Sequence, residues 1–142
     1  MGRAVIAIEE HWSTPGLAAA LDGKDDSLAF NTMGDNLARL EDIGDARLAE
    51  MDAQGVDVAV ISLAPPGTQP LDPGDAVALS RDINDIAAAA VRKHPARLKA
   101  FATLPMADPQ AAAGEFERAV REGFVGAMVY GRTGDVPLDD PR

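Results

Sequence analysis

One short segment of the chain combines side chains that could bind a metal ion. An apolar run, Arg3–Ile8, is followed by Glu9, Glu10 and His11, in a chain with only two histidines. Side chains of an extended strand alternate between two faces, so Glu9 and His11 are predicted to point to one face and Glu10 to the other. Zinc and manganese accept a carboxylate oxygen and an imidazole nitrogen together. The spacing therefore indicates two ligands of a divalent metal, and the alternative is a polar strand end that faces water.

Three further side chains are candidates for substrate contact. Trp12 directly follows the candidate ligands, and its ring could wall a ring-shaped substrate or pack into the core. Tyr130 and Arg132 follow the last apolar run, and Arg132 could bind a carboxylate through two parallel hydrogen bonds or lie in solvent. The second histidine, His94, falls in the predicted last turn of a helix, where a helix-terminal role is expected.

Composition excludes several classes of protein. The chain has 23 acidic and 13 basic residues, a net charge of −10, which argues against a binder of nucleic acid or of an anionic membrane surface. It has no cysteine, which excludes disulfides, thiolate metal sites and cysteine nucleophiles. No apolar run approaches the ~20 residues of a membrane helix, and the N-terminus does not resemble a secretory signal. We therefore expect a cytoplasmic protein.

The elements that would position these side chains alternate between strands and helices. Four short apolar runs are typical of strands buried on both faces: Arg3–Ile8, Val56–Leu63, Leu98–Thr103 and Phe124–Tyr130. Asp72 and Asp108, each followed by proline, predict the starts of two helices, and Gly55 and Gly123 predict helix ends. Such alternation implies a parallel sheet, either doubly wound or closed into a (β/α)8 barrel, with the chemistry at the carboxyl ends of the strands.

The intervening segments carry more specific expectations. The last helix is predicted to press one apolar stripe against the sheet, namely Ala112, Phe116, Ala119 and Val120. Leu17–Asp35 is interpreted as a long connection that contains a polar loop, Asp22–Ser27. The turn after the second strand is expected to shape the rim of the site or to act only as a rigid turn; its residues include Pro65, Pro66, Gly67 and Gln69.

Four blocks of the sequence, in order, resemble the amidohydrolase-related metal-dependent decarboxylases, and most closely the γ-resorcylate (2,6-dihydroxybenzoate) decarboxylase group. The blocks are IAIEEHWSTP, RLAEMDAQGVDVAVISLAPPGTQ, ARLKAFATLPMADPQAAAGEFERAV and GFVGAMVYGRTGDVPLDDPR. The resemblance runs from Val5 to Arg142. It implies an α/β fold, the N-terminal half of a distorted (β/α)8 TIM-type barrel with about four parallel strands and intervening helices. Residues 1–142 would then form a single partial domain.

The resemblance also implies a chemistry. Glu9 and His11 would be ligands of one divalent metal ion, zinc or manganese, while Glu10 turns away and supports the strand. The family's other ligands, a histidine and an aspartate, come from later strands, so no catalytic residue is expected within this chain. The implied reaction is the non-oxidative decarboxylation of a small aromatic, hydroxybenzoate-like acid by the full-length form, which is expected to be a homo-oligomer. Relatives commonly carry asparagine where this chain has Tyr130, which leaves the particular acid open.

Two alternatives accompany this expectation. One is a metal-dependent hydrolase of the same superfamily that acts on a lactone or an amide. The other is a non-catalytic half-barrel that pairs with another copy or with a separately encoded C-terminal half, because an open parallel sheet has an unpaired edge and an exposed apolar face.

Overall fold

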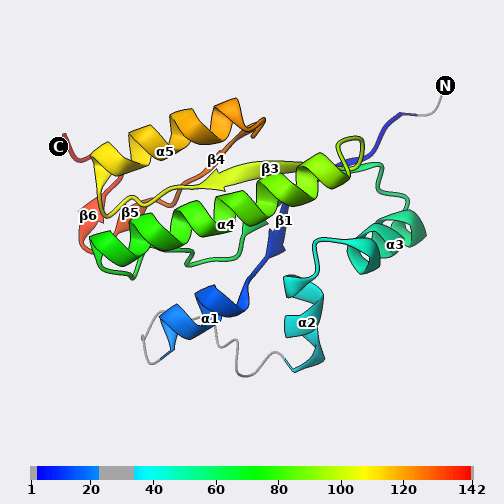
Figure 1. The fold of residues 1–142 in the computed structure, drawn as a ribbon, viewed down its shortest axis with the longest axis horizontal. Coiled ribbons are helices and arrows are strands. Elements are labelled where there is room, and N and C mark those ends of the chain that lie inside the picture. Colours follow the sequence, from blue (N-terminus) through cyan, green and yellow to red (C-terminus); the bar gives the residue numbers. More distant parts are fainter. Residues whose placement is uncertain (1–2, 23–33, 142) are drawn as a thin grey trace.

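The computed structural model describes residues 3–22 and 34–141, and its ribbon is shown in Figure 1. The described elements, in chain order, are β1 (Ile6–Trp12), α1 (Pro15–Leu21), α2 (Asp35–Glu41), α3 (Asp45–Gln54), β2 (Val58–Leu63), α4 (Pro73–Lys93), β3 (Leu98–Thr103), α5 (Pro109–Arg121), β4 (Gly126–Met128), β5 (Arg132–Thr133) and β6 (Val136–Pro137). Apart from Asp22, the predicted polar loop Asp22–Ser27 lies outside the described residues.

The four main strands form one parallel sheet in the order β1-β2-β3-β4. Each strand pairs with the next one along the chain, and helices lie between consecutive strands in the sequence (Figure 1). This is the arrangement of successive strand–helix units in a (β/α)8 barrel, and it confirms the predicted fold class. β5 and β6 form a separate antiparallel hairpin.

The two faces of the sheet differ in what covers them. Alternate residues of β2 and β3 belong to one hydrophobic core shared with α4 and α5, and we call their side the helix-covered face: Ala59, Ile61, Leu63, Leu98, Ala100 and Ala102. The residues that alternate with them along β2 and β3, together with their register partners in β1, form the opposite side, which we call the open face: Ile6, Ile8, Val58, Val60, Lys99 and Phe101. The side chains of Ile6 and Ile8 are 59% and 64% exposed there.

Strand bounds differ from the sequence prediction mainly at the two edges. β3 has the predicted bounds, and β2 begins at Val58 rather than Val56. The first strand was expected to end at Ile8, but β1 continues to Trp12 because an irregularity at Glu9 lets it stay paired with β2. The last strand is shorter than predicted: β4 covers only Gly126–Met128.

Helix starts and ends follow the predicted local signals. Proline occupies the first position of α4 and α5, and the Asp108 carboxylate accepts a hydrogen bond from the Ala111 amide at 3.0 Å. Asp72 takes the same place before α4, although no cap bond from its side chain occurs among the described residues. Gly55 and Gly123 adopt positive φ at helix ends, which glycine does without steric cost.

Two local structures were missed. The segment interpreted as a connection begins with α1, whose start carries a Thr14-Pro15 signal: the Thr14 hydroxyl accepts from the Leu17 amide at 3.0 Å. The segment after β4, to which no element was assigned, contains the β5–β6 hairpin, closed by Gly134-Asp135. A two-residue Gly-Asp loop between strands is a recognised hairpin signal.

The predicted apolar stripe of α5 is only half buried. Ala112 and Ala119 face the core, but Phe116 and Val120 are 39% and 51% exposed, so this prediction was wrong for the two larger residues. The geometry of a helix explains the split, because at ~100° per residue Phe116 and Val120 fall on one flank of the stripe. The residues that bridge to α4, such as Glu115 and Arg118, fall on the other flank.

Within residues 3–22 and 34–141, none of the helices has the length and apolar character needed to cross a membrane.

Candidate functional site

A β-bulge at the end of β1 sets the directions of the candidate ligands. In the register with β2, Ile8 pairs with Val60 and Glu10 pairs with Ile61, so Glu9 is skipped. Glu9 has φ 58°, a left-handed conformation that costs a non-glycine residue about 1–2 kcal/mol. The simple alternation expected for this strand is therefore interrupted at Glu9, although Glu10 and His11 still fall on opposite faces as expected. The bulge places Glu10 in register with the helix-covered face, and His11 pairs with Ser62 of β2, on the open face.

The His11 side chain is held from the neighbouring strand. Its Nδ1 atom lies 3.2 Å from the hydroxyl oxygen of Ser62, which is fully buried. The ring is half-buried, and Nε2 is the nitrogen left for another partner. The second histidine behaves as expected, since His94 is the C-cap of α4 and its amide donates to the Ala90 carbonyl.

The backbone at His11 is held from α3. The Arg47 guanidinium donates to the His11 carbonyl at 2.9 Å and to the Asp42 carbonyl at 2.8 Å. Burial lowers the pKa of Arg47, while the carboxylates of Glu10 and Asp42 oppose that shift. Glu10 thus lies on the side of Arg47 and stabilises the charge that anchors the end of β1, in keeping with a supporting role for this carboxylate.

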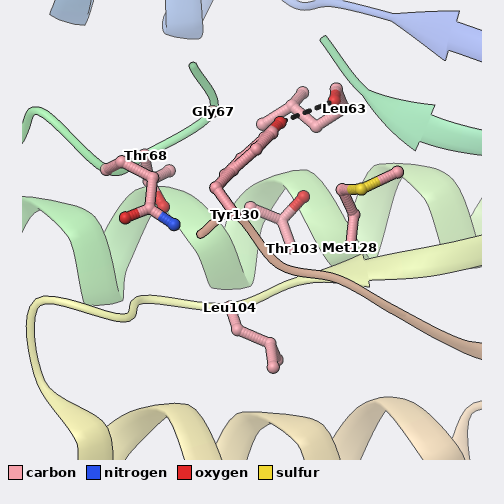
Figure 2. Close-up of a pocket in the computed structure, with 8 residues that line it drawn as sticks. Leu63, Gly67, Thr68, Thr103, Leu104, Met128 and Tyr130 are labelled. Atoms are coloured by element: carbon pink, nitrogen blue, oxygen red, sulfur yellow. Dashed lines mark hydrogen bonds between the residues drawn. The ribbon is translucent and has the colours of Figure 1, made fainter. Parts of the chain in front are cut away.

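Tyr130, which follows β4, comes close to Glu9. Its hydroxyl donates to the Leu63 carbonyl at 3.4 Å, as Figure 2 shows. Burial, and secondarily the Glu9 carboxylate, raises the pKa of Tyr130 to about 12. The phenol is therefore neutral near pH 7 and acts as a hydrogen-bond donor. Gly67 packs beside this ring, where a Cβ would lie in ordinary contact at 3.4 Å from Tyr130 Cε2, and its φ of +61° is what favours glycine.

A small cavity of about 10 Å³ lies at the carboxyl ends of β2, β3 and β4 (Figure 2). It is lined by Leu63, Gly67, Thr68, Gln69, Thr103, Leu104, Met128 and Tyr130. That volume holds about one water molecule. The turn residues Gly67 and Gln69 line this cavity, and Gln69 is tied to the hairpin by a hydrogen bond from Thr133. Pro65 and Pro66, joined by a cis peptide bond, precede them.

A polar network fixes the end of β3 at this cavity. The side chain of Asn84, on α4, donates to the Thr103 carbonyl and accepts from the Thr103 amide, both at 2.9 Å. Asn84 also donates to Glu115 at 2.7 Å, and Glu115 pairs with Arg118. Burial alone would raise the pKa of Glu115, but hydrogen bonds from Arg118 and Asn84 and the nearby positive charge hold it below its ordinary value.

The structure brings some predicted residues together and separates others. Glu9, His11 and Tyr130 all lie at the carboxyl ends of the parallel strands. Trp12 is in register with Leu63 and only 2% exposed, within the core. Arg132 is exposed on the hairpin.

Sequence reasoning overlooked Ser62 and Arg47. Ser62 had a visible signal, a lone hydroxyl in the apolar run VAVISL. Arg47 had none, since an arginine in a polar helix is ordinary.

Within the described part of the chain, no group of three or more histidine, aspartate or glutamate side chains gathers into a metal cage. Glu9 and His11 supply two donors, an exposed carboxylate and an imidazole with one engaged nitrogen. Divalent zinc and manganese accept this donor set, and a structural or catalytic site needs further ligands.

Comparison with known proteins identifies the family. The amidohydrolase family model matches residues 9–142, and the chain belongs to this family. It is 40% identical over 139 residues to the γ-resorcylate decarboxylase of Rhodococcus jostii (strain RHA1), an alignment that covers 94% of this chain and 40% of the relative. The chain thus spans about two fifths of the length of the curated relatives that it matches.

Solved structures of decarboxylases have the same fold over this length. The dihydroxybenzoic acid decarboxylase of Polaromonas sp. JS666, solved with bound manganese and the inhibitor 2-nitroresorcinol, is 37% identical with a TM-score of 0.79, covering 96% of this chain and 42% of that one. The 5-carboxyvanillate decarboxylase LigW of Sphingomonas paucimobilis is 32% identical with a TM-score of 0.89, covering 99% of this chain and 46% of that one.

Proposed function

We propose that this chain supplies the first four strands and two metal ligands of a metal-dependent decarboxylase acting on an aromatic hydroxy acid. The observation that carries the proposal is the bulged end of β1, which sends Glu10 toward Arg47 while Glu9 lies near Tyr130 and His11 contacts Ser62. The 40% identity to γ-resorcylate decarboxylase supports the reaction class. The rest of the barrel would supply the remaining ligands and the proton donor.

Glu9 and His11 would hold one divalent metal ion. Glu9 would offer its exposed carboxylate and His11 would offer Nε2, because Nδ1 is already engaged by Ser62. Manganese is favoured by the relative from Polaromonas sp. JS666, which was solved with that metal; zinc accepts the same donors. When bound, such an ion acts as a Lewis acid that orients a carboxylate and a neighbouring oxygen.

The chain's own residues would bind and orient the acid beside that site. The neutral Tyr130 phenol would donate a hydrogen bond to an oxygen of the substrate, and its ring would close the wall near Gly67. Arg132, exposed on the hairpin, is a candidate partner for a carboxylate. Trp12 would act through packing, since its ring is buried under the strand end.

The test is a decarboxylation assay of the full-length form with 2,6-dihydroxybenzoate. Chelation is expected to abolish CO2 release and added manganese to restore it. Glu9→Gln and His11→Gln should each lower activity at least 100-fold, because each removes a ligand; changes outside the ligand set already cost about 10–100-fold. Glu10→Gln is the matched control, since it changes a neighbouring carboxylate that faces Arg47. Unchanged CO2 release after loss of Glu9 and His11 would refute the proposal.

The same assay separates the hydrolase alternative, which the family itself keeps open. Opening of a lactone or amide without CO2 release would favour the hydrolase.

A non-catalytic half-barrel is favoured by one observation, the exposure of Ile6 and Ile8 on the open face. Residues 1–142 would then be a partial domain that pairs with a second copy or with a separate half. Sedimentation that shows a stable folded monomer would exclude that alternative. For the full-length form we propose a homo-oligomer in the cytoplasm, the location favoured by the absence of cysteine from the sequence.

A further inference from the structure

An arginine of α3 holds the backbone of β1 from the side that faces away from β2. Within the described residues, β1 is an edge strand that pairs only with β2. The Trp12 carbonyl accepts a hydrogen bond from the Ala64 amide, directly after β2, at 2.8 Å. Successive carbonyls of a strand point to opposite sides in the plane of the sheet, so the His11 carbonyl points to the outer edge. There it accepts its hydrogen bond from the Arg47 guanidinium, at 2.9 Å.

Arg47 is itself anchored at the corner between α2 and α3. Its amide donates to the Asp42 carboxylate at 3.1 Å, and its Nε donates to the Asp42 carbonyl at 2.8 Å. The guanidinium is a rigid planar fork of donors, so it can hold two carbonyls at a fixed separation. A second hydrogen bond joins the same corner to β1, because the Ser13 amide donates to the Leu40 carbonyl at 3.0 Å. The corner therefore fixes the end of β1 at two points.

The strained residue Glu9 lies two positions before the carbonyl that Arg47 holds. Its φ of 58° is costly for a residue other than glycine, and such a conformation persists only where the surrounding structure imposes it. Pairing with β2 before and after Glu9 holds one edge of the strand. The hydrogen bond from Arg47 acts on the opposite edge. Together the two restraints oppose a rotation of the strand end that would relax the bulge.

We propose that Arg47 is a positioning residue, whose hydrogen bond to the His11 carbonyl maintains the bulged end of β1 and thereby the directions of the Glu9 and His11 side chains. The metal ion that these side chains would bind rests on the function proposed above, whereas the restraint on the backbone does not.

Hydrogen exchange of the Ser13 amide, followed by NMR, measures how readily the end of β1 opens. Arg47→Met keeps an unbranched side chain that suits a helix but donates no hydrogen bond. It should speed exchange of the Ser13 amide at least about 10-fold, because hydrogen bonds from charged donors are among the strongest in proteins.

Arg97 offers a matched control at the amino ends of the strands. It is also half-buried, and its guanidinium donates to two backbone carbonyls, those of Asp57 at 2.8 Å and Val56 at 3.1 Å. Arg97→Met should speed exchange of the Asp57 amide, which donates to the Val5 carbonyl at 3.0 Å. It should leave the Ser13 amide unchanged, because each arginine holds its own end of the sheet.

Manganese titration measures the consequence for the candidate ligands. The paramagnetic ion broadens the ring signals of a histidine that it approaches, and His94→Gln assigns the signals of the two histidines. Arg47→Met should need about 10-fold more Mn²⁺ to broaden the His11 signals, the lower end of the usual cost of losing a group that orients a metal ligand. Arg97→Met should need no more than the wild type.

The two proposals fail in different ways. If Mn²⁺ leaves His11 of the wild type unaffected while Arg47→Met still speeds exchange of Ser13 and not of Asp57, the metal role fails and the restraint on the backbone stands. The positioning role is overturned if Arg47→Met leaves the Ser13 amide as it is in Arg97→Met, or speeds both amides equally. It is also overturned if the wild type binds Mn²⁺ and Arg47→Met needs no more of it.

A second variant carries the same comparison if Arg47→Met fails to fold by circular dichroism. Arg47→Lys has one compact donor group in place of the fork, so it should change the Ser13 amide and the Mn²⁺ requirement in the same direction by a smaller factor. The same outcomes that overturn the proposal for Arg47→Met overturn it for Arg47→Lys.

Discussion

The two faces of the sheet follow different rules although they alternate along the same strands. On the helix-covered face, Ile61, Leu98 and their neighbours are at most 2% exposed and belong to a single core. On the open face, Ile6 and Ile8 are more than half exposed at the amino end of β1, and polar groups gather at its carboxyl end. The difference teaches that burial supplies stability on one side, while on the other side the exposed residues of β1 are available for contact.

A matched pair of isoleucine substitutions, one on each face, tests this difference most strongly. Ile61→Ala should lower the free energy of unfolding by about 2–5 kcal/mol, because it leaves a cavity in a packed core. Ile8→Ala should change it by less than about 0.5 kcal/mol, because its side chain is 64% exposed. Urea unfolding followed by the fluorescence of the sole tryptophan, Trp12, measures both. An equal cost at the two positions would mean that the open face is covered in solution.

A smaller effect on stability is expected for Asn84, which links α4 to the carboxyl end of β3 beside the cavity. Asn84→Ala should cost about 1–3 kcal/mol, because it leaves the buried amide and carbonyl of Thr103 without their side-chain partner. Arg92→Ala, which breaks an exposed ion pair with Glu122, should cost less than about 1 kcal/mol. Denaturant unfolding compares the two variants, and a smaller loss for Asn84→Ala than for Arg92→Ala would contradict the network's role.

The smallest expected effect concerns the ionisation of Tyr130 at the candidate site. The pKa of Tyr130 is raised to about 12 from an ordinary 10.0, so the folded state favours the neutral phenol. Its stabilisation is fully present below pH 10.0 and is lost as the pH rises through about 12. Absorbance titration of the chain's single tyrosine measures this directly.

Glu9→Gln should lower that pKa without restoring the ordinary value, because burial is the larger cause and remains. A titration curve that Glu9→Gln leaves in place would show that the carboxylate and the phenol are not neighbours.

The sequence predicted the central strands and the long helices well, for local reasons. β3 kept its predicted bounds, and α5 began at the proline after Asp108, because apolar runs and cap residues act over a few neighbours. The edges were predicted less well. β1 extends beyond its apolar run through pairing with β2, an interaction between residues about 50 positions apart that no local pattern contains.

The candidate site, too, was predictable from the sequence only where local patterns determine it. Glu9 and His11 were recognisable from residue type and from resemblance, but the reason for their directions was not, since it depends on the positive φ of Glu9. Phe116 and Val120 were expected inside because periodicity identifies an apolar stripe without saying which of its flanks has a neighbour. Tyr130 and Gly67 meet only in the fold.

The bulge at Glu9 also restricts how this Glu-x-His motif can be used on another protein scaffold. On a regular strand, the Glu and His of a Glu-x-His motif point to one face, and the residue before the Glu points to the other. That apolar residue and the histidine would then lie on opposite faces of the sheet. Here one extra residue shifts the reading of the strand, and Ile8 and His11 keep the same side. A designer who copies these residues onto another scaffold must copy the left-handed backbone with them. Glycine or asparagine at this position would preserve the path of the chain while removing its carboxylate.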